Sequence, residues 1–152
     1  MEAGVGRVLV VVGAVDPGPA LAEAGLAERV TLVPNPRWAD GQATSLARAV
    51  AEARADDAEV LVVGLGDQPF VEAEAWRRVA SVSARHPIRV ATYDGRRRNP
   101  VGLHRRVWDD LPVEGDEGAR GLLARRPELV TEVPCPGEPA DVDTLEDLRR
   151  WS

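Results

Sequence analysis

The chain alternates short apolar runs with segments of helical spacing, and this alternation constrains the fold more than any other feature. Three runs rich in Val, Leu and Ala, at 7–15, 29–36 and 58–66, are typical of strands, the first of them of a strand buried on both faces. Apolar residues recur with a helical period in between, for example over 45–55. Strands that alternate with helices predict a mostly parallel sheet covered by helices, a three-layer α/β/α arrangement.

The same pattern continues in the second half of the chain. Strands are expected at 88–95 and 129–135, and between them a turn is followed by a strand or short helix over 99–111. Helices are expected at four places: 17–27, 71–85 with Ala75, Val79 and Val82 facing inward, 116–127, and 144–152. No repeat or linker interrupts the sequence, so we expect one domain over residues 1–152.

Composition narrows the classes of protein that remain. The chain has 152 residues, 44% of them hydrophobic, and a net charge of −6 with a pI near 5.0, which argues against general binding to nucleic acid or to an anionic membrane. No apolar stretch approaches the roughly 20 residues of a membrane span, and the first residues do not resemble a signal peptide, so a cytoplasmic location is expected. The single cysteine, Cys135, excludes an internal disulfide and is expected to be a loop thiol between prolines.

Two acidic segments follow expected strands. Asp67, in "GLGDQPF", lies where ligands bind at the carboxyl end of a parallel strand, and a carboxylate there can hold Mg²⁺. Asp141 and Asp143, in "ADVDTLEDL", could share one or two metal ions with it. The alternative for each segment is helix capping and the preference of acids for a helix start.

Other candidate binding residues lie in loops that lead into helices. Gly41, Thr44 and Ser45 precede or open the helix at 45–55 and suggest an anion site, although a capped surface helix explains them too. Arg96, Arg97 and Arg98 are expected in a turn, where they could meet phosphates or solvent. In "EGDEGARGLL", a helix cap explains Asp116 but not Arg120, which is unfavourable near a helix start without an anionic partner.

Five stretches, "NPRWADGQATSL", "GLGDQPFV", "RRRNPVG", "GDEGARGLL" and "DVDTLEDL", resemble the MobA-like nucleotidyltransferases in both order and spacing. This family includes the molybdenum-cofactor cytidylyltransferases and guanylyltransferases. The resemblance runs from about Val8 to Trp151 and implies a Rossmann-like nucleotide-diphospho-sugar transferase fold. The implied reaction moves a nucleoside monophosphate from CTP or GTP to a phosphorylated small-molecule acceptor such as molybdopterin, with Mg²⁺.

The resemblance also implies roles for individual residues. Asp67 would be the catalytic metal ligand and Asp143 the second ligand. The nucleotide would lie against Gly41, Thr44, Ser45, Gly66 and Asp67. The acceptor would lie against Asn99, Asp116, Glu117, Gly118 and Arg120. The mechanism would be in-line attack of the acceptor phosphate on the α-phosphorus, which requires positioning and charge neutralisation more than a protein nucleophile.

Two departures from the family pattern bear on function. Arg98-Asn99-Pro100 stands where the family often has Gly-His-Pro, which leaves the acceptor open. The family's opening strand, its glycine-rich phosphate loop and its first helix have no counterpart, so we expect an N-terminally truncated fold with impaired catalysis and an exposed sheet edge that could support self-association. Either Met1 is an internal or misassigned start, or the chain is a short form that binds without catalysis.

Three functions therefore stay open at this point. The first is a nucleotidyltransferase of the molybdopterin type. The second is a non-catalytic nucleotide-binding or scaffold domain. The third is a nucleotidyltransferase that acts on a sugar phosphate or a phospho-acid.

Overall fold

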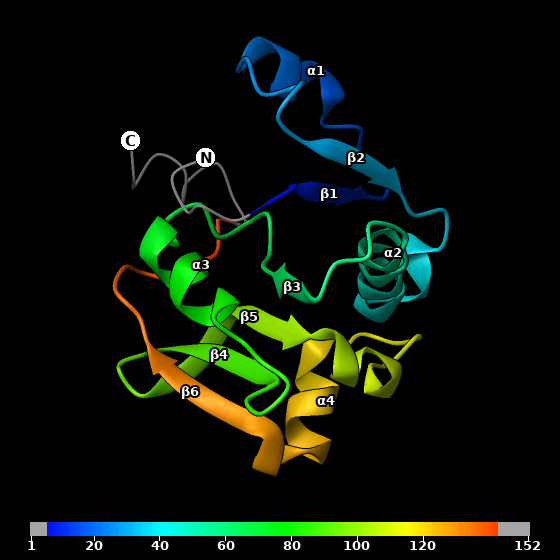
Figure 1. Ribbon diagram of the computed structural model, residues 1–152. Coiled ribbons are helices and arrows are strands. Elements are labelled where there is room, and N and C mark those ends of the chain that lie inside the picture. The colour runs from blue at the N-terminus through cyan, green and yellow to red at the C-terminus, as the bar shows by residue number, and fades with distance from the viewer. Residues whose placement is uncertain (1–5, 143–152) are drawn as a thin grey trace.

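Helices and strands alternate along the chain (Figure 1). The computed structural model describes residues 6–142; Asp143 and the helix expected at 144–152 lie outside them. In chain order, the elements are β1 (Leu9–Val12), α1 (Gly18–Glu23), β2 (Thr31–Pro34), η1 (Trp38–Asp40), α2 (Gln42–Ala55), β3 (Val60–Val63), α3 (Ala73–Ala80), β4 (Ile88–Tyr93), β5 (Arg96–His104), η2 (Arg105–Asp110), α4 (Ala119–Arg125), η3 (Pro127–Leu129) and β6 (Val130–Pro134), where η marks a 3₁₀ helix.

The strands form two sheets. β1 and β2 pair in parallel, and a four-stranded sheet has the order β3-β5-β4-β6. β5 runs antiparallel to β3 and to β4, whereas β4 and β6 are parallel, so three of the four strands in the larger sheet share one direction. The predicted mixed α/β fold with mostly parallel strands is confirmed, and the antiparallel β5 is the exception.

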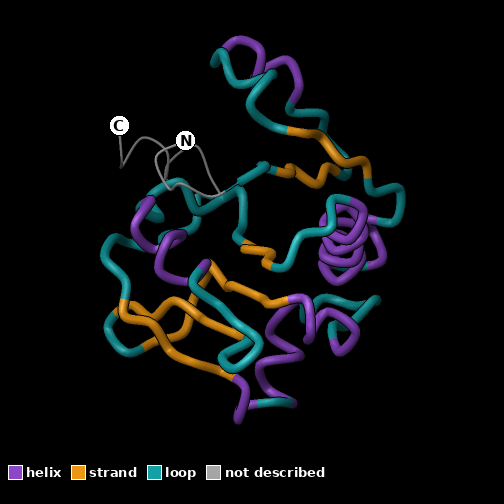
Figure 2. Tube along the Cα trace, viewed as in Figure 1, coloured by secondary structure: helices purple, strands orange, loops and turns teal. Residues whose placement is uncertain are grey.

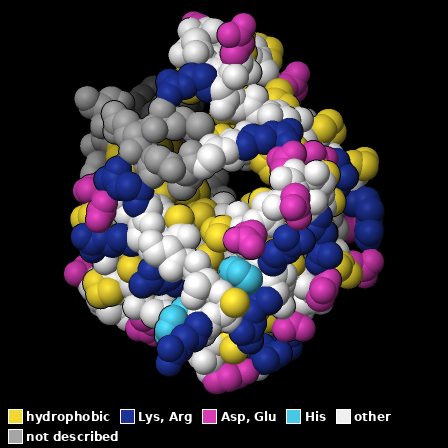
Figure 3. Space-filling model, viewed as in Figure 1, with side chains coloured by type: hydrophobic (Ala, Val, Ile, Leu, Met, Phe, Trp, Pro, Cys, Tyr) yellow, Lys and Arg dark blue, Asp and Glu magenta, His cyan; other side chains and the backbone are white. Residues whose placement is uncertain are grey.

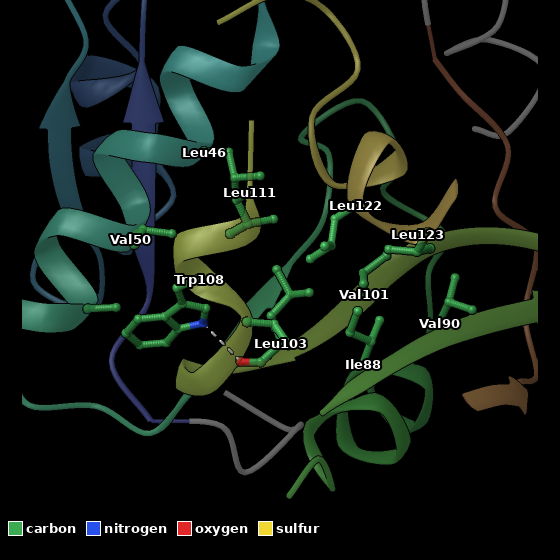
Figure 4. Packing of buried hydrophobic residues seen from close by; sticks show 12 residues of the cluster. Leu46, Val50, Ile88, Val90, Val101, Leu103, Trp108, Leu111, Leu122 and Leu123 are labelled. Carbon is green, nitrogen blue, oxygen red and sulfur yellow. Dashed lines mark hydrogen bonds between the residues drawn. The ribbon is translucent and has the colours of Figure 1, made fainter. Parts of the chain in front are cut away.

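Helices cover both faces of the four-stranded sheet, which gives the predicted three layers (Figure 2). On one face, α2, α4 and η2 pack their apolar side chains against Val90, Val101 and Leu103 (Figure 4). Trp108 of η2 is 4% exposed, and its indole N–H donates to the Leu103 carbonyl at 3.2 Å. On the other face, Ala75 and Val79 of α3 pack near Ala91, Tyr93 and Val133.

The sequence analysis overestimated the burial of β1. This strand was expected to be buried on both faces, but all four of its residues are only half-buried, as are all four of β3. Among residues 6–142, β1 pairs only with β2 and β3 only with β5, so each strand has one edge without a partner. Figure 2 shows the β1–β2 pair apart from the larger sheet, with α2 beside both.

The expected turn at Arg96–Arg98 is also wrong. The turn is confined to Asp94-Gly95, and the three arginines begin β5. Val90 pairs with Val101 and Ala91 with Arg98, so Asn99 and Pro100 form a bulge in β5. A bulge suits this position because proline has no N–H to donate to a neighbouring strand.

Two helical boundaries differ from those expected. α3 ends at Ala80, so Val82 lies beyond the helix and is half-buried rather than part of its inner face. α2 begins at Gln42 instead of Ser45, because Gly41 and the loop at 114–118 supply its first contacts. Within the described part of the chain, no helix has the length and apolar character required to cross a membrane.

Candidate active site

The loop that enters α2 is organised by one buried amide. Asn35 is 3% exposed, and its Nδ2 donates to Thr44 Oγ1 and to Ser45 Oγ, both at 2.9 Å. Its Oδ1 accepts from the Arg37 N–H at 3.0 Å. The buried Thr44 hydroxyl also lies 2.8 Å from the Gly41 carbonyl and 2.9 Å from that of Arg37. Thr44 therefore shapes this loop with its hydroxyl, while Ser45 lines a cavity.

The α2 loop is bound to the loop that precedes α4. The Ala43 N–H donates to the Gly115 carbonyl at 2.8 Å, and the Gly115 N–H donates to the Asp40 carbonyl at 3.3 Å. Arg37 pairs with Glu114 at 3.0 Å and with Asp40 at 2.9 Å, and the hydrogen bond to Asp40 is the main cause of a raised Arg37 pKa. The sequence-predicted nucleotide and acceptor segments are thus neighbours.

Gly41 is required at the junction of these two loops. Its φ is 107°, a region that side chains disfavour, and a Cβ here would lie 2.5 Å from the Gly115 carbonyl and 2.7 Å from Asp116 Oδ1. Asp116 therefore lies against the α2 loop, and Gly118 lies against the Gln42 side chain.

The two acidic segments meet, although 73 residues separate them. The Val142 N–H donates to the Asp67 carbonyl at 2.8 Å, and Gln68 Nε2 donates to Asp141 Oδ1 at 2.6 Å. The Asp67 side chain is exposed, and Gln68 is only 9% exposed. Since Gln68 Nε2 binds a carboxylate, its Oε1 is an acceptor, and this buried atom has no hydrogen-bond partner among the described residues.

This donor set suits a hard divalent cation. Asp67 and Asp141 supply carboxylate oxygens on adjoining segments, and oxygen is the ligand that Mg²⁺ and Mn²⁺ prefer. Within residues 6–142, no cluster of three or more His, Cys, Asp or Glu side chains forms a ready metal site. Asp143, the expected second ligand, lies outside the described residues.

Most of the predicted site residues border one cavity of about 1570 Å³. Figure 3 shows an opening near the middle of the visible face. The lining of this cavity includes Ser45, Gly66, Gln68, Asn99, Glu117, Gly118, Arg120 and Asp141, whereas Gly41, Thr44, Asp67 and Asp116 lie behind it or beside it. The structure therefore brings together segments that the sequence singled out separately.

Arginines supply positive charge around this cavity. Arg98 and Arg120 line it and are exposed, and neither forms an ion pair with another residue in the range 6–142. Arg97 also lines the cavity, but its guanidinium forms an ion pair with Glu132 at 2.7 Å. The unfavourable position of Arg120 in the first turn of α4 is thus not offset by a described acidic side chain, so an anionic ligand would stabilise it.

The cysteine is not a nucleophile in this arrangement. Cys135 follows β6 and is half-buried, and its Sγ lies 3.3 Å from the Val133 carbonyl. Burial raises the pKa of the Cys135 thiol, which favours its neutral form.

The sequence analysis missed two residues that organise the site. Asn35 was quoted within a motif but given no role, although Asn before Pro at a strand end is a common turn signal. Gln68 follows Asp67 directly, but no local pattern indicates that its amide reaches Asp141.

An α/β fold whose glycine-containing and acidic loops converge on one cavity is typical of nucleotide-binding domains. The chain belongs to the MobA-like NTP transferase domain family, whose model matches residues 1–130. It is therefore a nucleotidyltransferase at the level of the family.

Solved structures support the fold. Rv0371c from Mycobacterium tuberculosis H37Rv, in a complex with manganese, is 30% identical with a TM-score of 0.72, and the match covers 98% of this chain and 79% of that one. A second structure of Rv0371c gives 29% identity, a TM-score of 0.76, and coverage of 99% and 77%. A nucleotidyl transferase from Methanothermobacter thermautotrophicus has the same fold, at 22% identity and a TM-score of 0.76, with coverage of 99% and 73%. No curated protein sequence gave a significant match.

Proposed function

We propose that this protein is a divalent-cation-dependent enzyme of the cytoplasm that transfers a nucleoside monophosphate from CTP or GTP to a phosphorylated small molecule such as molybdopterin. The observation that carries the proposal is the pair of hydrogen bonds that joins Asp67-Gln68 to Asp141-Val142 at the cavity. This junction brings the segment of Asp67 next to that of Asp141, which supports a metal site formed by Asp67 and the acidic segment that leads to Asp143.

In this proposal, Asp67 binds Mg²⁺ together with the 141–143 segment. A bound divalent cation neutralises charge on the triphosphate. The manganese complex of Rv0371c supports a divalent cation in this fold. Gly41, Thr44, Ser45 and Gly66 shape the nucleotide side, where Ser45 and Gly66 line the cavity.

The acceptor side adjoins the nucleotide side, where the loop before α4 is bound to the loop that enters α2. Asn99 projects from the β5 bulge, and Arg120 lies in the first turn of α4 beside Glu117 and Gly118, with Asp116 behind them. A guanidinium binds a phosphate through two parallel hydrogen bonds, so Arg120 together with Arg98 would orient the acceptor phosphate. Attack of that phosphate on the α-phosphorus releases pyrophosphate, and the side chains contribute position and charge.

The test is thermal unfolding with each of CTP, GTP, ATP and UTP, with and without Mg²⁺ or Mn²⁺. A nucleotide at a hundred times its dissociation constant stabilises by about 2.7 kcal/mol. For a chain of this size the midpoint should rise by roughly 5–10 °C. We expect a rise that requires the cation, favours one base and disappears in Asp67→Asn, and we expect the same substitution to abolish any pyrophosphate release.

Asp16→Asn is the matched control. Asp16 is exposed, lies outside the cavity, and accepts from the Gly18 N–H at 2.8 Å through an oxygen that asparagine retains. A nucleotide-dependent shift that survives in Asp67→Asn would reject the role of Asp67. A panel of phosphorylated acceptors, molybdopterin and sugar phosphates among them, would then identify the second substrate from the pyrophosphate released.

A further inference from the structure

A second, smaller cavity lies at the turn between β4 and β5, and we call it the hairpin pocket. Its volume is about 480 Å³. The hairpin contributes Tyr93, Asp94, Arg96 and Arg98 to its lining, and the segment 138–140 forms the other wall. Of these residues only Arg98 also lines the cavity of the active site, so the two cavities adjoin at this side chain.

The wall formed by 138–140 is held on both sides by backbone hydrogen bonds. Before it, the Cys135 N–H donates to the Thr92 carbonyl of β4 at 3.0 Å. After it, the Val142 N–H donates to the Asp67 carbonyl at 2.8 Å. The path of this segment beside the hairpin is therefore fixed by the fold.

The strand register places two arginines and the tyrosine on one face of the sheet. Arg96 pairs with Tyr93, and Arg98 pairs with Ala91. Residues that face each other across an antiparallel pair project to the same side. Because Ala91 and Tyr93 pack with α3, both arginines extend on the α3 face. The arginine between them projects to the other face, where it is paired with a glutamate of β6.

These three side chains have hydrogen-bond donors that the fold does not use. In the part of the chain covered by residues 6–142, neither Arg96 nor Arg98 forms an ion pair or a side-chain hydrogen bond. Tyr93 is 7% exposed, and its buried hydroxyl has no partner among the same residues. Burial raises the pKa of Tyr93 to about 12, so the phenol keeps its proton and can donate at neutral pH. A buried hydroxyl without a partner destabilises a fold, and a bound ligand is one reason for a protein to retain it.

We propose that the hairpin pocket binds the phosphate group of a small phosphate monoester. A phosphate offers several oxygen acceptors, and the pocket supplies three donor groups, the guanidiniums of Arg96 and Arg98 and the phenol of Tyr93. A carboxylate has two oxygens and matches three donor groups less well. The volume is that of a small-molecule site, and the net charge of −6 favours a free molecule over a lipid in an anionic membrane.

Two acidic side chains, Asp94 and Glu138, also line the pocket. Both are exposed, and within the described residues neither pairs with Arg96 or Arg98. Water and salt screen exposed charges, whereas a guanidinium in contact with phosphate forms short, charge-assisted hydrogen bonds. The two carboxylates therefore lower the affinity for phosphate without abolishing it, and Glu138→Gln should raise this affinity about twofold.

The experiment is an NMR titration of the full chain with glycerol 3-phosphate at constant ionic strength. The protein carries tyrosine labelled with ¹³C at Cζ, the carbon that bears the hydroxyl, and since Tyr93 is the only tyrosine the label gives one signal. We expect this signal to shift along a saturable curve. Glycerol without the phosphate is the control and should leave the signal in place.

Three arginine variants test the location. Arg96→Gln should weaken binding at least about tenfold, because it removes a charged donor pair from the pocket. Arg85→Gln makes the same change at an exposed arginine outside both cavities and should have no effect. Arg120→Gln changes the active-site cavity alone and should leave the response of Tyr93 as it is.

Tyr93→Phe tests the hydroxyl by itself. With the Arg96 side-chain N–H as the reporter, this variant should bind at least about fivefold more weakly. The absence of a saturable shift in the wild-type protein, an equal shift with glycerol, or full binding by Arg96→Gln would overturn the proposal. Loss of the Tyr93 response in Arg120→Gln would place the ligand in the active-site cavity and would overturn it too.

The proposal does not rest on nucleotide transfer. Arg96 has no role in the proposed active site, so Arg96→Gln should keep the rise of the unfolding midpoint that nucleotide and cation produce together. Failure of one proposal can therefore be told from failure of the other.

Discussion

Replacing Asn35 by alanine tests whether one buried amide organises the entrance to α2. The side chain makes three hydrogen bonds, two through Nδ2 to the Thr44 and Ser45 hydroxyls and one through Oδ1 from the Arg37 N–H. Each such bond contributes about 0.5–1.5 kcal/mol, and Asn35 is 3% exposed, so water cannot easily replace its partners. We expect Asn35→Ala to lower the free energy of unfolding by about 3 kcal/mol, or the midpoint by roughly 6–12 °C.

The assay is urea unfolding followed by tryptophan fluorescence, with the slope against urea checked for constancy. Ser45→Ala removes only one of the three bonds and should cost about 1 kcal/mol. Ser81→Ala is the control, since its exposed hydroxyl makes a 3.4 Å contact and its loss should stay within about 0.5 kcal/mol. The reasoning is refuted if Asn35→Ala costs no more than Ser45→Ala.

Two further predictions concern the packing of the sheet. Gly102→Ala should lower the free energy of unfolding, measured in urea, by more than about 3 kcal/mol, because a Cβ there would lie 1.9 Å from the Val79 carbonyl of α3. Gly6→Ala is the control and should be neutral, because the space around Gly6 is open. Equal effects of the two substitutions would contradict this packing. Tyr93 is the only tyrosine, and burial, with smaller effects of Cys135 and Glu72, raises its pKa to about 12. The Tyr93 phenol therefore stays neutral in the folded protein, and its contribution to stability is complete below pH 10 and is lost as the pH rises toward 12. Absorbance of the phenolate at alkaline pH should show this late titration. A titration midpoint near pH 10 in the folded protein would count against the prediction.

Periodic patterns were sufficient to predict the order of the elements. The β-branched run before Gly13 indicates a strand, and the helical spacing of apolar residues after Ser45 indicates a helix with one buried face. Both patterns can be read from a window of a few residues, without knowledge of the rest of the fold. Strand ends were less well predicted, because β1 and β3 are shorter than their apolar runs. Those runs extend beyond the residues that have a strand partner.

The site was predictable only in its separate pieces. Gly41 and Asp67 lie in loops after strands, a position that the sequence indicates, and the order of their motifs identified the family. The link from Gln68 to Asp141 was not predictable, because it spans 73 residues and depends on which loops the sheet brings side by side.

The sequence by itself therefore determined the fold class, the family and the loops that carry the chemistry, since local periodicity and short motifs encode them. Only the tertiary structure decided that β5 is antiparallel, that Arg96–Arg98 belong to a strand, and that residues of β1 and β3 line the same cavity. The physical reason is that strand pairing is a contact between distant segments, and an apolar run has the same pattern whether its edge finds a partner or not.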